Sequence, residues 1–116
     1  MKKNIFQKEA KKAFLIELNE LKAFYASKDF NVGDLCQEIL NCKGKVFLTG
    51  VGKSGHIANK ISATFSSTGT SSFFIHPAEA LHGDMGMIEK NDCIIVLSKS
   101  GESKEIIDLI PVSYTH

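Results

Sequence analysis

The sequence predicts one domain built on a parallel α/β sheet, and two observations support that prediction. Three short apolar runs, at residues 45–49, 71–75 and 92–97, are separated by segments with helical periodicity or turn residues. Two of these runs end in turns rich in glycine and serine, from which a helical pattern starts at once. With 116 residues, 43% hydrophobic and 23% charged, the chain has the composition of a small globular domain.

The first 44 residues are expected to form two helices. Apolar side chains recur near a 3.6-residue period across residues 4–26, which predicts a long amphipathic helix. Its apolar positions are Phe6, Ala10, Ala13, Phe14, Leu18, Leu21 and Phe24. A shorter helix is predicted over 32–42, with Gly44 as its stop. We expect residues 1–44 to pack on the sheet domain formed by residues 45–116.

The remaining elements alternate as strand, helix, strand, turn, strand and helix. A helix over 54–68 follows the first strand, and Gly69 ends it. The second strand closes at Pro77, because proline cannot extend a ladder. The third strand is apolar almost throughout, as expected of a central parallel strand covered on both faces. The other predicted segments are a helical turn at 77–81, a glycine-punctuated loop at 82–87 and a last helix at 102–110.

Charge and cysteine content exclude several classes of function. The net charge of +1 gives no electrostatic reason to expect binding to nucleic acid or to an anionic membrane. No apolar run approaches the ~20 residues of a membrane span, and no signal peptide is recognisable. Cys36, Cys42 and Cys93 show no C-x-x-C spacing, which favours reduced thiols in a cytoplasmic protein.

The turn after the first strand has the chemistry of an anion site, because the first N–H groups of a helix lack partners and carry its positive dipole end. Its Gly-Lys-Ser triplet suggests a Walker A loop. That motif needs a glycine five positions before Gly52, where Phe47 stands instead. Gly50, Gly52 and Gly55 satisfy the dinucleotide pattern G-x-G-x-x-G. The second strand, however, ends without the carboxylate that such a site uses to hold a ribose.

A third interpretation uses a second loop, in which Ser98, Ser100 and Ser103 surround Gly101 after the third strand. In isolation such serines favour a capped turn. Two loops rich in hydroxyls and amides at the carboxyl ends of parallel strands would instead converge on one crevice, where open α/β sheets place ligands. Together they could hold a monophosphate without Mg²⁺, so no metal and no cofactor is expected.

The motifs resemble those of a known family. Gly-Val-Gly-Lys-Ser-Gly-His, Ser-Ser-Thr-Gly-Thr, His-Pro-Ala-Glu-Ala-Leu-His-Gly-Asp and Ser-Lys-Ser-Gly-Glu-Ser are similar to the sugar-isomerase (SIS) domain of bacterial arabinose-5-phosphate isomerases. The resemblance implies a three-layer parallel sheet of flavodoxin-like type. It also implies interconversion of D-ribulose 5-phosphate and D-arabinose 5-phosphate for the Kdo sugar of lipopolysaccharide, in a cytoplasmic homotetramer that often carries paired CBS domains.

The same resemblance assigns roles to individual residues. The residues implied to bind the phosphate are Gly52, Ser54, Ser98, Ser100, Gly101 and Ser103. Lys53 matches a lysine that contacts the substrate, Glu105 matches an acid/base carboxylate, and His82 matches an active-site histidine. An aldose–ketose isomerase needs such a set, because a base must move a carbon-bound proton while positive charge stabilises the enediolate. Glu102 is the rival carboxylate, and His76 and His56 are weaker candidates.

The sequence also departs from the family. Lys99 stands between two serines where family members have asparagine, and residues 113–116 do not continue the last helix. We therefore expect a domain truncated after the third strand and its following helix, inactive by itself. A sugar-phosphate-sensing SIS module of a regulator is the alternative of another class, although no recognition-helix character precedes the sheet. An isomerase for another sugar phosphate also stays open.

Overall fold

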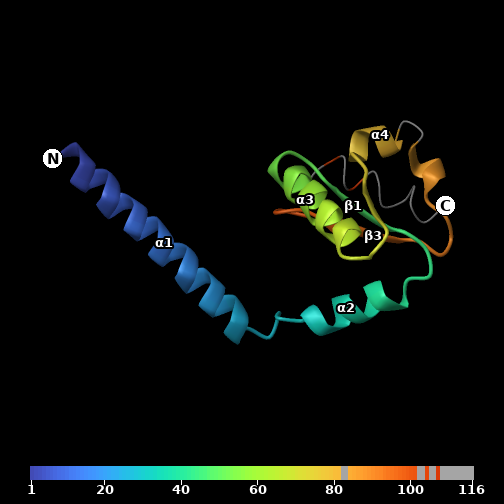
Figure 1. Ribbon diagram of the computed structural model, residues 1–116, viewed down its shortest axis with the longest axis horizontal. Helices are drawn as coiled ribbons and strands as arrows, with labels where there is room; N and C mark the ends of the chain where they lie inside the picture. The colour runs from blue at the N-terminus through green and yellow to red at the C-terminus, as the bar shows by residue number, and fades with distance from the viewer. Residues whose placement is uncertain (82–83, 102–103, 105–106, 108–116) are drawn as a thin grey trace. The chain divides into compact units, whose positions relative to one another are not determined.

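The computed structural model describes residues 1–81, 84–101, 104 and 107 (Figure 1). They belong to two compact units, Met1–Gln37 and Glu38–His116. The predicted N-terminal helices are α1, Lys2–Ala26, and α2, Val32–Asn41. Ser27 ends α1, where its hydroxyl donates to the Phe24 carbonyl oxygen at 2.8 Å. The packing of residues 1–44 on the sheet domain stays a prediction.

A three-stranded parallel sheet forms the centre of the second unit, as the sequence predicted. Its strands are β1, Val46–Gly50, β2, Ser72–Phe74, and β3, Cys93–Leu97, in the order β2-β1-β3. β1 pairs with β3 along its whole length, from Val46 opposite Cys93 to Gly50 opposite Leu97. The first strand in sequence is therefore the central one, whereas the sequence pattern favoured the third.

Both faces of β1 are covered, which gives the three layers of the fold. Val46 and Leu48 point to the helix α3, Lys53–Ser67, where they pack with Ala58. Phe47 points to the opposite face and packs with Ile75 and Ala80 of the segment that contains α4, Pro77–Leu81. Every residue of β1 is buried, because side chains alternate between two covered faces. Figure 1 shows α3 running beside β1.

One predicted segment differs in detail from the structure. The glycine-punctuated loop contains a 3-10 helix, η1, over Asp84–Met87. Most of the predicted helix over 102–110 lies outside the described residues. None of the helices in the described part of the chain has a stretch long and apolar enough to cross a bilayer.

Candidate functional site

The glycine turn between β1 and α3 is built by backbone contacts that exclude side chains. A Cβ atom on Gly55 would lie 2.6 Å from the Gly50 carbonyl oxygen, and one on Gly50 would lie 2.8 Å from the Ser54 carbonyl carbon. Gly52 has a φ of +60°, in a region that L side chains rarely adopt. The three glycines therefore allow the end of β1 to meet the first turn of α3 directly.

The first turn of α3 offers groups suited to an anion. The helix begins at Lys53, and the His56 N–H bonds to the Gly52 carbonyl oxygen at 3.2 Å. The N–H groups before His56 therefore have no intrahelical acceptor. No side chain among the described residues caps this end, which leaves the positive end of the helix dipole available. The Lys53 side chain is exposed and has no ion-pair partner among the described residues, and Ser54 is half-buried.

The serine loop after β3 is partly stabilised by its own side chains. Gly101 has a φ of +70°, and its N–H donates to the Ser98 hydroxyl oxygen at 2.9 Å. Ser98 therefore does act as a turn cap, and its own O–H hydrogen is still able to donate to a ligand. Ser98, Lys99 and Ser100 are exposed.

The strand register brings these two loops together. Gly50 lies opposite Leu97 in the parallel pair of β1 and β3, so Val51 and Ser98 leave the sheet at neighbouring positions. The described groups that the sequence assigned to phosphate binding thus occur at one edge of the sheet, the edge formed by the carboxyl ends of the strands. This is the edge where open α/β folds bind ligands.

A cavity of about 300 Å³ opens on the other side of the glycine turn, toward β2. It is lined by Gly50, Gly52, Gly55, His56, Asn59, Phe74 and His76. No described residue of the serine loop lines it. The carboxyl edge therefore has two neighbouring parts: the pair of loops, and a cavity beside the first of them.

The sequence indicated one polar residue of this cavity, His76, only as a weaker candidate, and it did not indicate the other, Asn59. His76 accepts a hydrogen bond at Nδ1 from the Ala78 N–H, at 3.1 Å, so the neutral imidazole carries its proton on Nε2. Asn59 was missed altogether. The sequence signal that could have found it is its spacing, since it lies three residues after His56 and shares a helix face with it.

The remaining predicted site residues lie outside the described residues. They are His82, Ser103 and Glu105, with the rival Glu102. Their proposed roles rest on the sequence. Among the residues that are described, no three His, Cys, Asp or Glu side chains come together as a metal site would require.

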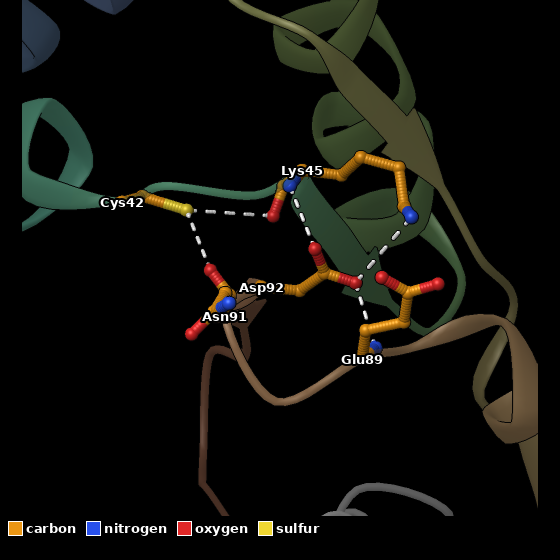
Figure 2. Close-up of polar contacts among 5 residues, drawn as sticks. All are labelled: Cys42, Lys45, Glu89, Asn91 and Asp92. Atoms are coloured by element: carbon orange, nitrogen blue, oxygen red, sulfur yellow. Dashed lines mark hydrogen bonds and ion pairs between the residues drawn. The ribbon is translucent and has the colours of Figure 1, made fainter.

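The other edge of the sheet, formed by the amino ends of the strands, is stabilised by one buried carboxylate (Figure 2). Asp92, whose side chain is 1% exposed, accepts hydrogen bonds from the backbone N–H groups of Lys45 and Glu89, each at 2.7 Å. The Lys45 ammonium lies 3.7 Å from Asp92 Oδ2. Burial raises the pKa of Asp92, but the hydrogen bonds from Glu89 and Lys45 and the Lys45 charge outweigh burial and hold it below its ordinary value.

Two thiols lie beside this carboxylate. Figure 2 shows the Cys42 sulfur near the carbonyl oxygens of Lys45, at 3.6 Å, and Asn91, at 3.5 Å. Burial raises the pKa of the Cys93 thiol, and Cys42 and Glu38 raise it further. The cavity here, of about 210 Å³, is lined by Glu38, Asn41, Cys42, Asn91, Asp92 and Cys93. Because the buried acid of this cavity already accepts two backbone hydrogen bonds and faces the Lys45 ammonium, the cavity is a poorer candidate for a ligand site than the carboxyl edge.

Comparison with known proteins gives consistent results. Residues 39–114 match the family model described as the SIS domain. The arabinose 5-phosphate isomerase KdsD of Salmonella typhi is 50% identical over 109 residues, which cover 92% of this chain and 33% of that protein. The KpsF isomerase of Escherichia coli O6:H1 is 64% identical over 73 residues, covering 63% of this chain and 22% of that protein.

A solved structure agrees with these sequence relatives. An E. coli CFT073 protein in complex with arabinose 5-phosphate superimposes with a TM-score of 0.76 at 45% identity, covering 91% of this chain and 60% of that one. The chain spans about a third of the length of the KdsD relative and less of the KpsF relative.

Proposed function

The chain belongs to the SIS-domain family, and on that premise we propose that it forms the phosphate-binding part of an arabinose-5-phosphate isomerase. The observation that carries this proposal is the pairing of Gly50 with Leu97, which places the glycine turn and the serine loop at neighbouring strand ends. The names of the relatives and the sugar-phosphate complex of the E. coli protein support the choice of substrate.

In the proposed complex the phosphate lies between the two loops. Backbone N–H groups at the start of α3 donate to it, together with the hydroxyls of Ser54 and the serine loop. Lys53 has no ion-pair partner among the described residues, so its charge is free to interact with the phosphate or with the developing enediolate oxygen.

The first test measures binding of D-arabinose 5-phosphate by isothermal titration calorimetry. Lys53→Ala removes a charge-assisted contact worth about 1.5–3 kcal/mol, so we expect the Kd to rise about tenfold or more. Lys60→Ala is the matched control, because Lys60 is an exposed lysine of the same helix that does not line the cavity. Equal affinities for wild type and Lys53→Ala would contradict the role of Lys53, and an absence of wild-type binding would contradict the proposed function.

Chemistry requires a group that moves a proton between C2 and C1 while the carbonyl shifts to the other carbon. We propose that Glu105 is this acid/base group and that His82 assists the proton transfer, both in a cytoplasmic, homotetrameric enzyme. In an isomerase that contains this segment, Glu105→Gln is expected to lower kcat by roughly 100-fold or more, the usual contribution of general acid–base catalysis. The assay follows conversion of D-ribulose 5-phosphate.

Glu38→Gln is the matched control for that assay. Glu38 is an exposed glutamate that lines the cavity at the opposite edge of the sheet. A Glu105→Gln enzyme with wild-type kcat would remove Glu105 from the mechanism and leave Glu102 as the candidate base.

A further inference from the structure

The cavity beside the glycine turn combines two kinds of surface. Gly55 contributes backbone on one side, and His56 and Asn59 contribute polar side chains from α3. Phe74 and His76, at the end of β2, form the other side. A volume of about 300 Å³ is at the lower end of the range for small-molecule sites. An apolar ring surface with a few polar groups is the usual composition of such a site.

Asn59 is placed to reach a ligand that is anchored at the first turn of α3. It lies four residues after Gly55 and three after His56, so the three positions share one helix face. Its position is about 9 Å along the helix axis from Lys53, from the rise of 1.5 Å per residue. Side chains of an α-helix tilt toward its N-terminus, so the Asn59 amide leans back toward the anion-binding end.

The chemistry of Asn59 suits hydroxyl groups. Its amide offers both an acceptor oxygen and two N–H donors, and it has no hydrogen-bond partner among the described residues. Because the amide is neutral, it has little attraction for phosphate compared with Lys53. His76 adds a donor at Nε2 on the facing side of the cavity, since its Nδ1 is already occupied.

We propose that Asn59 is a specificity-determining residue that hydrogen-bonds the sugar hydroxyls of a bound sugar phosphate in this cavity. The inference rests on the proposed function, because it assumes that the phosphate lies at the first turn of α3. It assigns the two parts of the carboxyl edge different tasks: the paired loops bind the phosphate, and the cavity binds the polyol.

The test compares two ligands, D-arabinose 5-phosphate and inorganic phosphate, by calorimetry with the full chain. Asn59→Ala is expected to raise the Kd for the sugar phosphate about three- to tenfold, the effect of losing one or two neutral hydrogen bonds, and to leave inorganic phosphate binding unchanged. Lys60→Ala, one residue away on the same helix and outside the cavity lining, is expected to change neither affinity.

The other outcomes separate this inference from the proposed function. If Asn59→Ala binds the sugar phosphate as tightly as wild type, or loses affinity for both ligands equally, the inference is overturned while the proposed function stands. If the wild-type chain does not bind the sugar phosphate, the proposed function is overturned and the inference with it. Circular dichroism checks that the substitution Asn59→Ala, at an exposed position, has not altered the fold.

Discussion

The two edges of the sheet use the same kinds of polar group in opposite ways. At the amino edge, which is formed by the amino ends of the strands, Asp92 accepts hydrogen bonds from two backbone N–H groups and faces the Lys45 ammonium. At the carboxyl edge, the first N–H groups of α3 have no intrahelical acceptor, and Lys53 and Asn59 have no partner among the described residues. The polar groups of the amino edge are paired within the protein, whereas at the carboxyl edge the first N–H groups of α3, Lys53 and Asn59 stay open beside a serine loop that is partly paired.

This difference separates residues that hold the fold from residues that can bind a ligand. A polar group that is buried and fully paired contributes to stability and cannot bind a ligand without losing its partners. An exposed group near a cavity costs little when it is unpaired, because water satisfies it until a ligand arrives. The glycines of the turn between β1 and α3 strengthen the contrast, since a Cβ atom on Gly50 or Gly55 would collide with the backbone where the end of β1 meets the first turn of α3.

The largest predicted effect is at the amino edge. Asp92→Ala would leave the N–H groups of Lys45 and Glu89 without an acceptor, so we expect the free energy of unfolding to fall by about 3 kcal/mol. Urea unfolding followed by circular dichroism measures this. Asn59→Ala is the matched control at the carboxyl edge and is expected to change stability by less than about 0.5 kcal/mol. Equal losses in the two variants would remove the distinction between the edges.

The charge on Asp92 makes the free energy of unfolding depend on pH, in a direction that its pKa determines. The pKa of Asp92 in the folded protein lies below its ordinary value. The contribution of this charge to the free energy of unfolding is therefore complete above the pKa that Asp92 has in the unfolded chain, and it is lost as the pH falls through the folded pKa. We expect the stability advantage of wild type over Asp92→Asn to be constant near neutrality and to shrink below about pH 4. An advantage that grew on acidification would mean that burial outweighs the hydrogen bonds.

Local chemistry made much of the fold predictable from sequence. The turn between β1 and α3 could be predicted because Gly50, Gly52 and Gly55 are needed by the backbone of that turn itself. The role of Asp92 could not be predicted, because its partner Lys45 is 47 residues away. Nothing in the local sequence identifies the two N–H groups that donate hydrogen bonds to its carboxylate. Asn59 resembles any polar residue on the outer part of a helix until the cavity beside it is known.

The choice of central strand shows the same limit. The sequence favoured the third strand because it is almost continuously apolar, yet among the described strands β1 is the one paired on both sides. β1 includes Thr49 in its buried stretch, and that hydroxyl lowered the apparent hydrophobicity of the strand. The burial of a strand in the described unit depends on the order of the strands in the sheet. That order is set by pairing between distant segments, so the composition of a single strand predicts it poorly.

Thr49 provides the smallest and most discriminating prediction, because it is a buried polar residue without the pairing that Asp92 has. Its side chain is fully buried at the carboxyl end of β1, and its hydroxyl has no hydrogen-bond partner among the described residues. Thr49→Val replaces that hydroxyl with a methyl group and removes the cost of its desolvation, so we expect the free energy of unfolding to rise by about 1 kcal/mol. Urea unfolding is again the measurement, and Thr49→Ser, which keeps the hydroxyl and loses the methyl group, is expected to be destabilised. A loss of stability in Thr49→Val would show that the hydroxyl is paired in solution, and the carboxyl edge would then resemble the amino edge more closely than its described contacts indicate.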